Sequence, residues 1–129
     1  MRRTILTAAH CVNVDDNRIK LTDLRLVIGA MDLAKADDDG MYNVKISKIE
    51  IHRNYKIKRN DYDFAIISLD CDLEYDHGVA PVCLGQIHNP SLYENRDTVA
   101  VGWGRTECVN NHPTKLQVMV SISFVFLVF

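Results

Sequence analysis

The chain has 129 residues, a length that allows one domain with a modest hydrophobic core. Its composition, 47% hydrophobic and 25% charged residues, is that of an ordinary globular domain. The formal net charge of −2 argues against a nucleic-acid partner, or an anionic membrane, held by bulk electrostatics.

Apolar residues recur mostly at every second position, which is the period of a β-strand rather than of a helix. In chain order, the pattern predicts one helical turn at residues 8–11 and strands at residues 24–29, 44–51, 64–69, 97–101 and 116–126. The alternation slips at Ser47 and Lys48, where we expect a bulge. The segment at residues 64–69 is a short apolar run, so we expect this strand to be buried on both faces.

Turn-forming residues separate these runs, and no long helical pattern interrupts them. The turn signals lie at residues 38–40, 59–61, 77–78, 89–90 and 110–113. Short strands spaced by turns are typical of an antiparallel barrel or sandwich, so the sequence predicts an all-β fold. The apolar segment at residues 118–129 is shorter than the ~20 residues of a membrane-spanning helix, and we expect no membrane partner.

The cysteines stand at four separate positions: Cys11, Cys71, Cys83 and Cys108. Their spacing contains no C-x-x-C, which argues against a zinc ribbon and against a redox dithiol. An even number suits disulfides formed in an oxidising compartment. Four cysteines permit three pairings, and the sequence does not choose among them.

Two residues stand out as candidates for chemistry. His10 follows two alanines, and a histidine in such a place is, without context, more often structural than catalytic. Asp63 lies directly before the apolar strand, where an ionised carboxylate is costly to desolvate unless hydrogen bonds or a cation compensate it. An imidazole N–H is such a partner. The alternative is that Asp61 and Asp63 only cap a turn.

Four motifs follow one another along the chain: T-A-A-H-C at residues 7–11, D-F-A-I-I-S-L at 63–69, P-V-C-L-G at 81–85 and V-G-W-G at 101–104. Together they resemble the chymotrypsin/trypsin-like serine endopeptidases (peptidase S1 type), and T-A-A-H-C is the most specific element. The resemblance implies an all-β fold of two six-stranded antiparallel barrels with the active site between them. We expect a fragment, truncated at both ends, that holds the first barrel, the inter-barrel linker and the opening strands of the second. We expect residues 1–120 to form this partial domain, and residues 121–129 to be an apolar tail that does not match the family.

The resemblance also implies roles for single residues. His10 matches the general base, and Asp63 matches the buried carboxylate that orients it. Asp61 is in the wrong register, because the apolar strand begins directly after Asp63. Trp103, between two glycines, is expected in the core. The resemblance implies no cofactor, and the acidic loop at residues 36–40 lacks the ligand spacing of an EF-hand, so we expect a solvated turn and no metal site.

The family's nucleophile is missing from the sequence. No G-D-S-G-G-P segment occurs, and three serines stand in unrelated contexts: Ser91, Ser121 and Ser123. Without a nucleophile and the oxyanion donors of the same segment, we expect this chain to be inactive alone. The resemblance implies a protein or peptide substrate and a secreted, extracellular protein, although no signal peptide is visible. The alternative is a non-enzymatic homologue that acts as a regulatory or binding module.

The resemblance bears on the cysteines as well. Cys11 lacks the upstream partner that family members have, so we expect it to be free. Cys83 matches the position that in many members tethers the catalytic domain to a pro-region, which makes a disulfide-linked pro-region a candidate partner. Cys71 and Cys108 match no family position, and their pairing stays open.

Overall fold

The structure is a computed structural model that describes residues 2–14, 17–35, 42–75, 78–84, 96–105 and 112–121. Within these segments the elements are strands and single-turn 3-10 helices, without an α-helix. Every strand pair is antiparallel, which confirms the predicted all-β fold class. Within these segments the strands form one three-stranded sheet and three two-stranded ladders. None of the described helices has the length and apolar character needed to cross a membrane.

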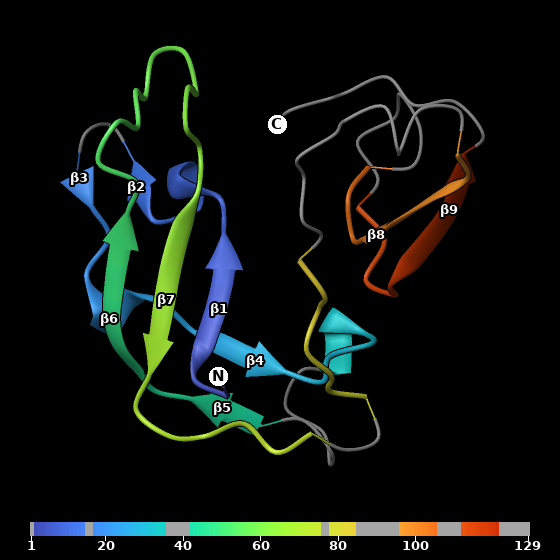
Figure 1. The fold of residues 1–129 in the computed structure, drawn as a ribbon. Helices are drawn as coiled ribbons and strands as arrows, with labels where there is room; N and C mark the ends of the chain where they lie inside the picture. The colour runs from blue at the N-terminus through green and yellow to red at the C-terminus, as the bar shows by residue number, and fades with distance from the viewer. Residues whose placement is uncertain are drawn as a thin grey trace. The chain divides into compact units, whose positions relative to one another are not determined.

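The chain divides into two units, of which the first contains Met1–Gly29 and Asp39–Pro81. This unit is built on a three-stranded sheet in the order β1-β7-β6 (Figure 1). The sheet strands are β1 (Thr4–Thr7), β6 (Ile46–Ile51) and β7 (Ala65–Leu69). Two short ladders accompany the sheet: β2 (Asn13–Val14) with β3 (Asn17–Arg18), and β4 (Leu26–Ile28) with β5 (Tyr42–Val44). Two 3-10 turns connect these strands: η1 (Ala9–Cys11) and η2 (Leu21–Asp23).

The central strand β7 is buried on one face only. Its inward side chains are all buried: Ala65, Ile67 and Leu69. Ile66 points to the other face, where it is 40% exposed and lies opposite Leu6, which is 57% exposed. The prediction of burial on both faces is therefore wrong, because the described residues cover only one face of this sheet.

The predicted bulge in β6 is confirmed. The pairing of β6 with β7 shifts between Ile46 and Lys48. Beside the shift, the Ser47 hydroxyl donates a hydrogen bond to the Ser68 carbonyl, at 3.0 Å. The extra residue restores the phase of the alternation, so that Ile49 is again buried.

The core of the first unit lies under the inner face of the sheet. Its buried members come from every part of the unit: Ala9, Val12, Ile28, Val44, Ile49, Ala65, Ile67, Leu69 and Leu73. The alternation predicted at residues 24–29 is present, since Leu24 and Leu26 pack against this core while Arg25 is exposed. The strand itself is shorter than predicted, because only the three residues of β4 pair with β5.

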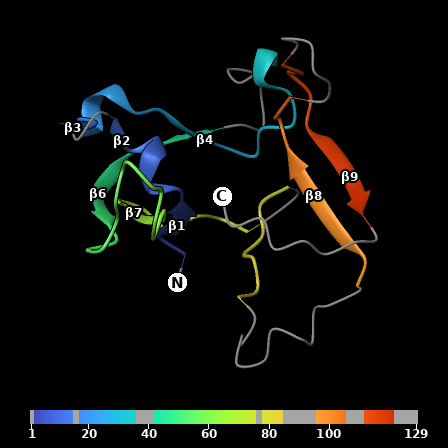
Figure 2. The ribbon, with the colours of Figure 1, turned by 90° about the horizontal axis from the view of Figure 1, so that it is seen from above.

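The second unit contains Ala30–Asp38 and Val82–Val128. Its strands β8 (Thr98–Gly102) and β9 (Gln117–Ser121) form an antiparallel ribbon (Figure 2). The turn η3 (Leu33–Lys35) is tied to the segment before β9, because the Leu33 N–H donates to the Thr114 carbonyl at 2.8 Å. These strands confirm the predictions at residues 97–101 and 116–121. Residues 122–126 of the predicted strand lie outside the described residues.

Trp103 follows β8 in the second unit and is half-buried rather than fully buried. Its indole nitrogen is enclosed and has no hydrogen-bond partner among the described residues. Trp103 was expected in the core, and only part of its side chain is buried.

Candidate active site

His10 lies on the single 3-10 turn that follows β1. Ala8 continues the extended backbone of the strand, with φ −76° and ψ 142°, and η1 begins at the next residue. The Ala9 side chain is fully buried in the core, whereas the His10 side chain is 54% exposed. The turn predicted at residues 8–11 is confirmed, and it presents the imidazole at the surface.

The pairing of β1 with β7 brings Asp63 to His10. Thr7, the last residue of β1, lies opposite Ala65, the first residue of β7. Because antiparallel strands run in opposite directions, the residues after Thr7 and those before Ala65 leave the sheet at the same end. His10 and Asp63 meet there, although 53 positions separate them in the sequence.

The Asp63 carboxylate makes two contacts with His10. Its Oδ2 lies 2.6 Å from His10 Nδ1, and its Oδ1 accepts a hydrogen bond from the His10 backbone N–H at 2.9 Å. An ionised carboxylate can only accept hydrogen bonds, so Nδ1 has to carry the proton that is shared in the ring contact. In the neutral ring, Nε2 is then the unprotonated nitrogen that can take up a proton.

The charge of Asp63 is maintained despite its burial, since its side chain is only 2% exposed. Burial alone would raise the pKa of this carboxyl group. Three hydrogen bonds lower it: one from the His10 ring and two from the backbone N–H groups of His10 and Ala9. The net result is that the pKa of Asp63 lies below its ordinary value. Asp63 is therefore ionised at neutral pH.

The segment around Asp63 is held from both sides by His52. The Phe64 N–H donates to the Tyr62 carbonyl at 2.8 Å, which makes a three-residue turn centred on Asp63. The His52 N–H donates to the Phe64 carbonyl at 3.1 Å. The His52 ring stacks on Tyr62, with 4.9 Å between centroids and 17° between planes, and lies tilted against Phe64 at 4.5 Å. Sequence analysis missed His52, and the only signal for it was the pair of aromatic residues that flank Asp63.

Asp61 is held elsewhere. Its carboxylate lies 3.3 Å from Arg59 Nε, and its backbone carbonyl accepts a hydrogen bond from the Lys56 N–H at 3.1 Å. The structure thus places Asp63, and not Asp61, beside the histidine, as the register argument required.

The described residues do not add a hydroxyl to this pair. Within them, the His10 ring is hydrogen-bonded to Asp63 alone. Ser121 ends β9 in the second unit, and Ser91 and Ser123 lie outside the described residues. The arrangement therefore provides a base and its carboxylate partner.

The cysteines of the described segments form no disulfide. Cys11, Cys71 and Cys83 are exposed thiols, and Cys108 lies outside the described residues. The four cysteines were candidates for disulfides, and no disulfide joins any two of Cys11, Cys71 and Cys83. The described residues likewise contain no group of three or more potential metal ligands, and the acidic loop at residues 37–39 falls outside them.

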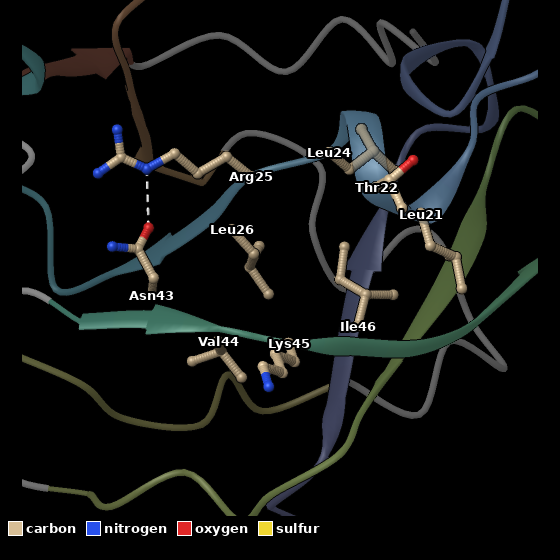
Figure 3. Close-up of a pocket in the computed structure, with 9 residues that line it drawn as sticks. All are labelled: Leu21, Thr22, Leu24, Arg25, Leu26, Asn43, Val44, Lys45 and Ile46. Atoms are coloured by element: carbon tan, nitrogen blue, oxygen red, sulfur yellow. Dashed lines mark hydrogen bonds between the residues drawn. The ribbon is translucent and has the colours of Figure 1, made fainter.

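A separate hollow of about 420 Å³ opens between η2, β4, β5 and the start of β6 (Figure 3). Its floor is apolar, with Leu24, Leu26 and Ile46 among the lining residues. At its rim the Arg25 Nε donates to the Asn43 side-chain oxygen at 2.7 Å. Neither His10 nor Asp63 lines it, so this hollow is not the place where the pair would act.

Comparison with known proteins gives a consistent result. The family model described as Trypsin matches residues 1–123. Venom serine protease 34 of Apis mellifera is 32% identical over 110 residues, which cover 81% of this chain and 26% of that protein. Trypsin-1 of Astacus astacus is 30% identical over 113 residues, which cover 87% of this chain and 45% of that protein. The clotting factor G beta subunit of Tachypleus tridentatus is 29% identical over 104 residues, which cover 80% of this chain and 32% of that protein.

The chain spans between about a quarter and just under a half of the length of these relatives. The matches cover most of the chain itself, and the family-model match includes the histidine and aspartate motifs. They agree with the antiparallel strands and with a fold that has no α-helix in its described parts. The chain belongs to the trypsin family of chymotrypsin-like serine proteases.

Proposed function

We propose that this chain contributes the general base and the orienting carboxylate of a trypsin-like endopeptidase. The observation that carries the proposal is the 2.6 Å contact between His10 Nδ1 and the buried Asp63 carboxylate. In this role His10 Nε2 accepts the proton of the attacking hydroxyl and later donates it to the leaving amine. Asp63 keeps the proton on Nδ1 and stabilises the imidazolium that forms, and it stays ionised throughout.

The nucleophile and the oxyanion donors have to come from residues outside this sequence. The sequence has no glycine-flanked serine of the family type, and a base without a nucleophile has no acyl transfer to promote. We therefore propose that the 129-residue chain does not cleave peptides alone. The chemistry of the pair needs no metal and no organic cofactor.

The proposed substrate is a protein or peptide, and the proposed location is extracellular. Both rest on family membership and on relatives named as a venom serine protease and as a clotting factor subunit. Cys83 supports a disulfide-linked pro-region, because its thiol is exposed and unpaired and therefore accessible to a partner. Non-reducing mass spectrometry of the secreted material would detect this link as a peptide attached through Cys83.

The test is peptide hydrolysis by the complete polypeptide that contains this segment, as wild type, His10→Ala and Asp63→Asn. We expect the wild type to hydrolyse peptide esters and to react with a fluorophosphonate probe at a serine outside these 129 residues. Each variant should lose about 10⁴-fold in kcat. The isolated chain should not be labelled, and labelling of any of its serines would contradict the proposed division of the site.

The missing nucleophile motif also favours a second candidate, a non-enzymatic homologue that binds or regulates other proteins. The same experiment separates the two. A complete polypeptide that neither hydrolyses peptides nor reacts with the probe would exclude the protease and leave the homologue.

A further inference from the structure

Residues 52–62, which we call the basic loop, differ in charge from the rest of the chain. They contain one carboxylate, Asp61, and four cations that are all exposed: Arg53, Lys56, Lys58 and Arg59. Four positive charges minus one negative charge give the loop +3, with histidine neutral, in a chain whose total is −2. The positive potential is therefore concentrated on one short loop.

Most of this charge is not neutralised locally. Arg59 Nε lies 3.3 Å from the Asp61 carboxylate. Arg53, Lys56 and Lys58 have no ion-pair partner in the part of the chain that the structure describes. Three like charges on one loop repel each other, and an anionic ligand would relieve that repulsion.

The basic loop also contains a hollow of side-chain size. Arg53, Asn54, Tyr55, Lys56 and Tyr62 line a space of about 390 Å³. Two cationic residues and two tyrosines are thus among the residues that line the same space. Such a lining suits a carboxylate, which the cations attract, on an aliphatic stem, which packs against the rings.

Tyr62 is held in place at the border of this hollow. Its side chain is 53% exposed and its ring stacks on His52, at 4.9 Å between centroids. Its φ of 55° lies in the left-handed region, which a bulky residue rarely adopts. Backbone strain of this kind clusters at ligand-binding sites.

The hollow lies next to the candidate active site, since Tyr62 directly precedes Asp63. The basic loop leaves the sheet after β6 and returns before β7, at the end of the sheet where η1 carries His10 (Figure 1). A peptide chain held at the basic loop would therefore be close to the imidazole.

We propose that the basic loop binds an acidic peptide segment of the protein substrate, with one aspartate or glutamate side chain in the hollow between Arg53 and Lys56. This inference rests on the proposed function and adds a substrate class to it. A sulfated polysaccharide is the less favourable ligand, because it would need a row of cations and would gain nothing from a hollow bordered by two tyrosines.

Binding is measured by fluorescence anisotropy with the full 129-residue chain. The probes are a fluorescein-labelled peptide of alternating glutamate and glycine, and a matched glutamine and glycine peptide. We expect the acidic peptide to bind about tenfold more tightly than the neutral one, and to lose this advantage at high salt. The double variant Arg53→Gln/Lys56→Gln should weaken binding about five- to twentyfold, from two exposed charge contacts of modest strength.

The control double variant, Lys20→Gln/Lys45→Gln, changes the net charge equally outside the basic loop and should alter binding by less than about twofold. Circular dichroism checks that both double variants keep the wild-type fold. Equal weakening in the two would mean that only net charge matters and would overturn the proposal. A heparin oligosaccharide that binds more tightly than the acidic peptide, and that depends on Arg53 and Lys56, would also overturn it. Since the readout is binding, a complete polypeptide without hydrolytic activity would contradict the proposed protease and leave this measurement intact.

Discussion

The substitution Asp63→Asn tests the central contact, because it keeps the shape of the side chain and removes its charge. The carboxylate accepts two hydrogen bonds from His10, at 2.6 and 2.9 Å, and asparagine offers one oxygen and one NH₂ group in their place. When the amide oxygen accepts the His10 backbone N–H, the NH₂ group faces Nδ1, which can accept its hydrogen bond once the ring proton has moved to Nε2. The variant therefore keeps both contacts as neutral hydrogen bonds of about 0.5–1.5 kcal/mol in place of charge-assisted ones of about 1.5–3 kcal/mol. We expect the free energy of unfolding to fall by about 1–3 kcal/mol at neutral pH.

The pH dependence of this loss follows from the lowered pKa of Asp63. A carboxyl group with a folded-state pKa below its ordinary value of 3.8 stabilises the folded state above that value. The stabilisation disappears as the pH falls through the lower, folded-state pKa. The difference in the free energy of unfolding between wild type and D63N should therefore be constant from about pH 7 to about pH 5 and shrink below about pH 4.

The assay is urea unfolding of the 129-residue chain followed by far-UV circular dichroism at several pH values. Asp61→Asn is the matched control, because Asp61 is a carboxylate of the same loop and pairs with Arg59 instead of His10. Its removal should lower the free energy of unfolding by less than about 1 kcal/mol. A D63N variant no less stable than D61N would refute the reasoning. So would a difference that stays constant down to the lowest pH at which the chain remains folded.

Three further predictions concern the sheet, the basic loop and the thiols. Ile67→Ala, at a buried position of β7, should lower the free energy of unfolding by about 2–4 kcal/mol, whereas Ile66→Ala on the open face should lower it by less than about 1 kcal/mol. Equal losses in urea unfolding would show that both faces of the sheet are covered. Asn60 has a φ of 52°, so Asn60→Val should lower the free energy of unfolding by about 1–2 kcal/mol, while Asn60→Gly should stay within about 1 kcal/mol of wild type. A valine variant as stable as the glycine variant would contradict the left-handed backbone. Iodoacetamide should alkylate Cys83 in the folded chain without a reductant, as mass spectrometry would show, and reaction only after reduction would indicate a disulfide.

Local patterns in the sequence predicted local features well. The slip in alternation at Ser47 and Lys48 predicted the bulge, because a bulge is a one-residue insertion that the pattern itself records. The same reasoning failed for β7. An apolar side chain such as Ile66 indicates that a position tolerates burial, and it does not say whether another layer lies over it.

The site was predictable only where a motif with a known order pointed to it. Periodicity alone could not pair His10 with Asp63, since their meeting depends on the register of β1 against β7. The resemblance supplied that pairing in advance. No motif pointed to His52, because its stacking on Tyr62 depends on the left-handed backbone of a loop, and that backbone is set by tertiary contacts rather than by residue spacing.

The difference in exposure within the pair accounts for the division of roles between its members. A residue that exchanges protons with a substrate has to be reachable, and the His10 side chain is 54% exposed. A residue that holds the ring in one tautomer has to keep one position and one charge state, and Asp63 is enclosed, ionised and bound by a ring N–H and a backbone N–H of the same residue. Because the backbone contact fixes the turn and the ring contact fixes the imidazole, a single carboxylate couples the local fold to the protonation geometry of the base.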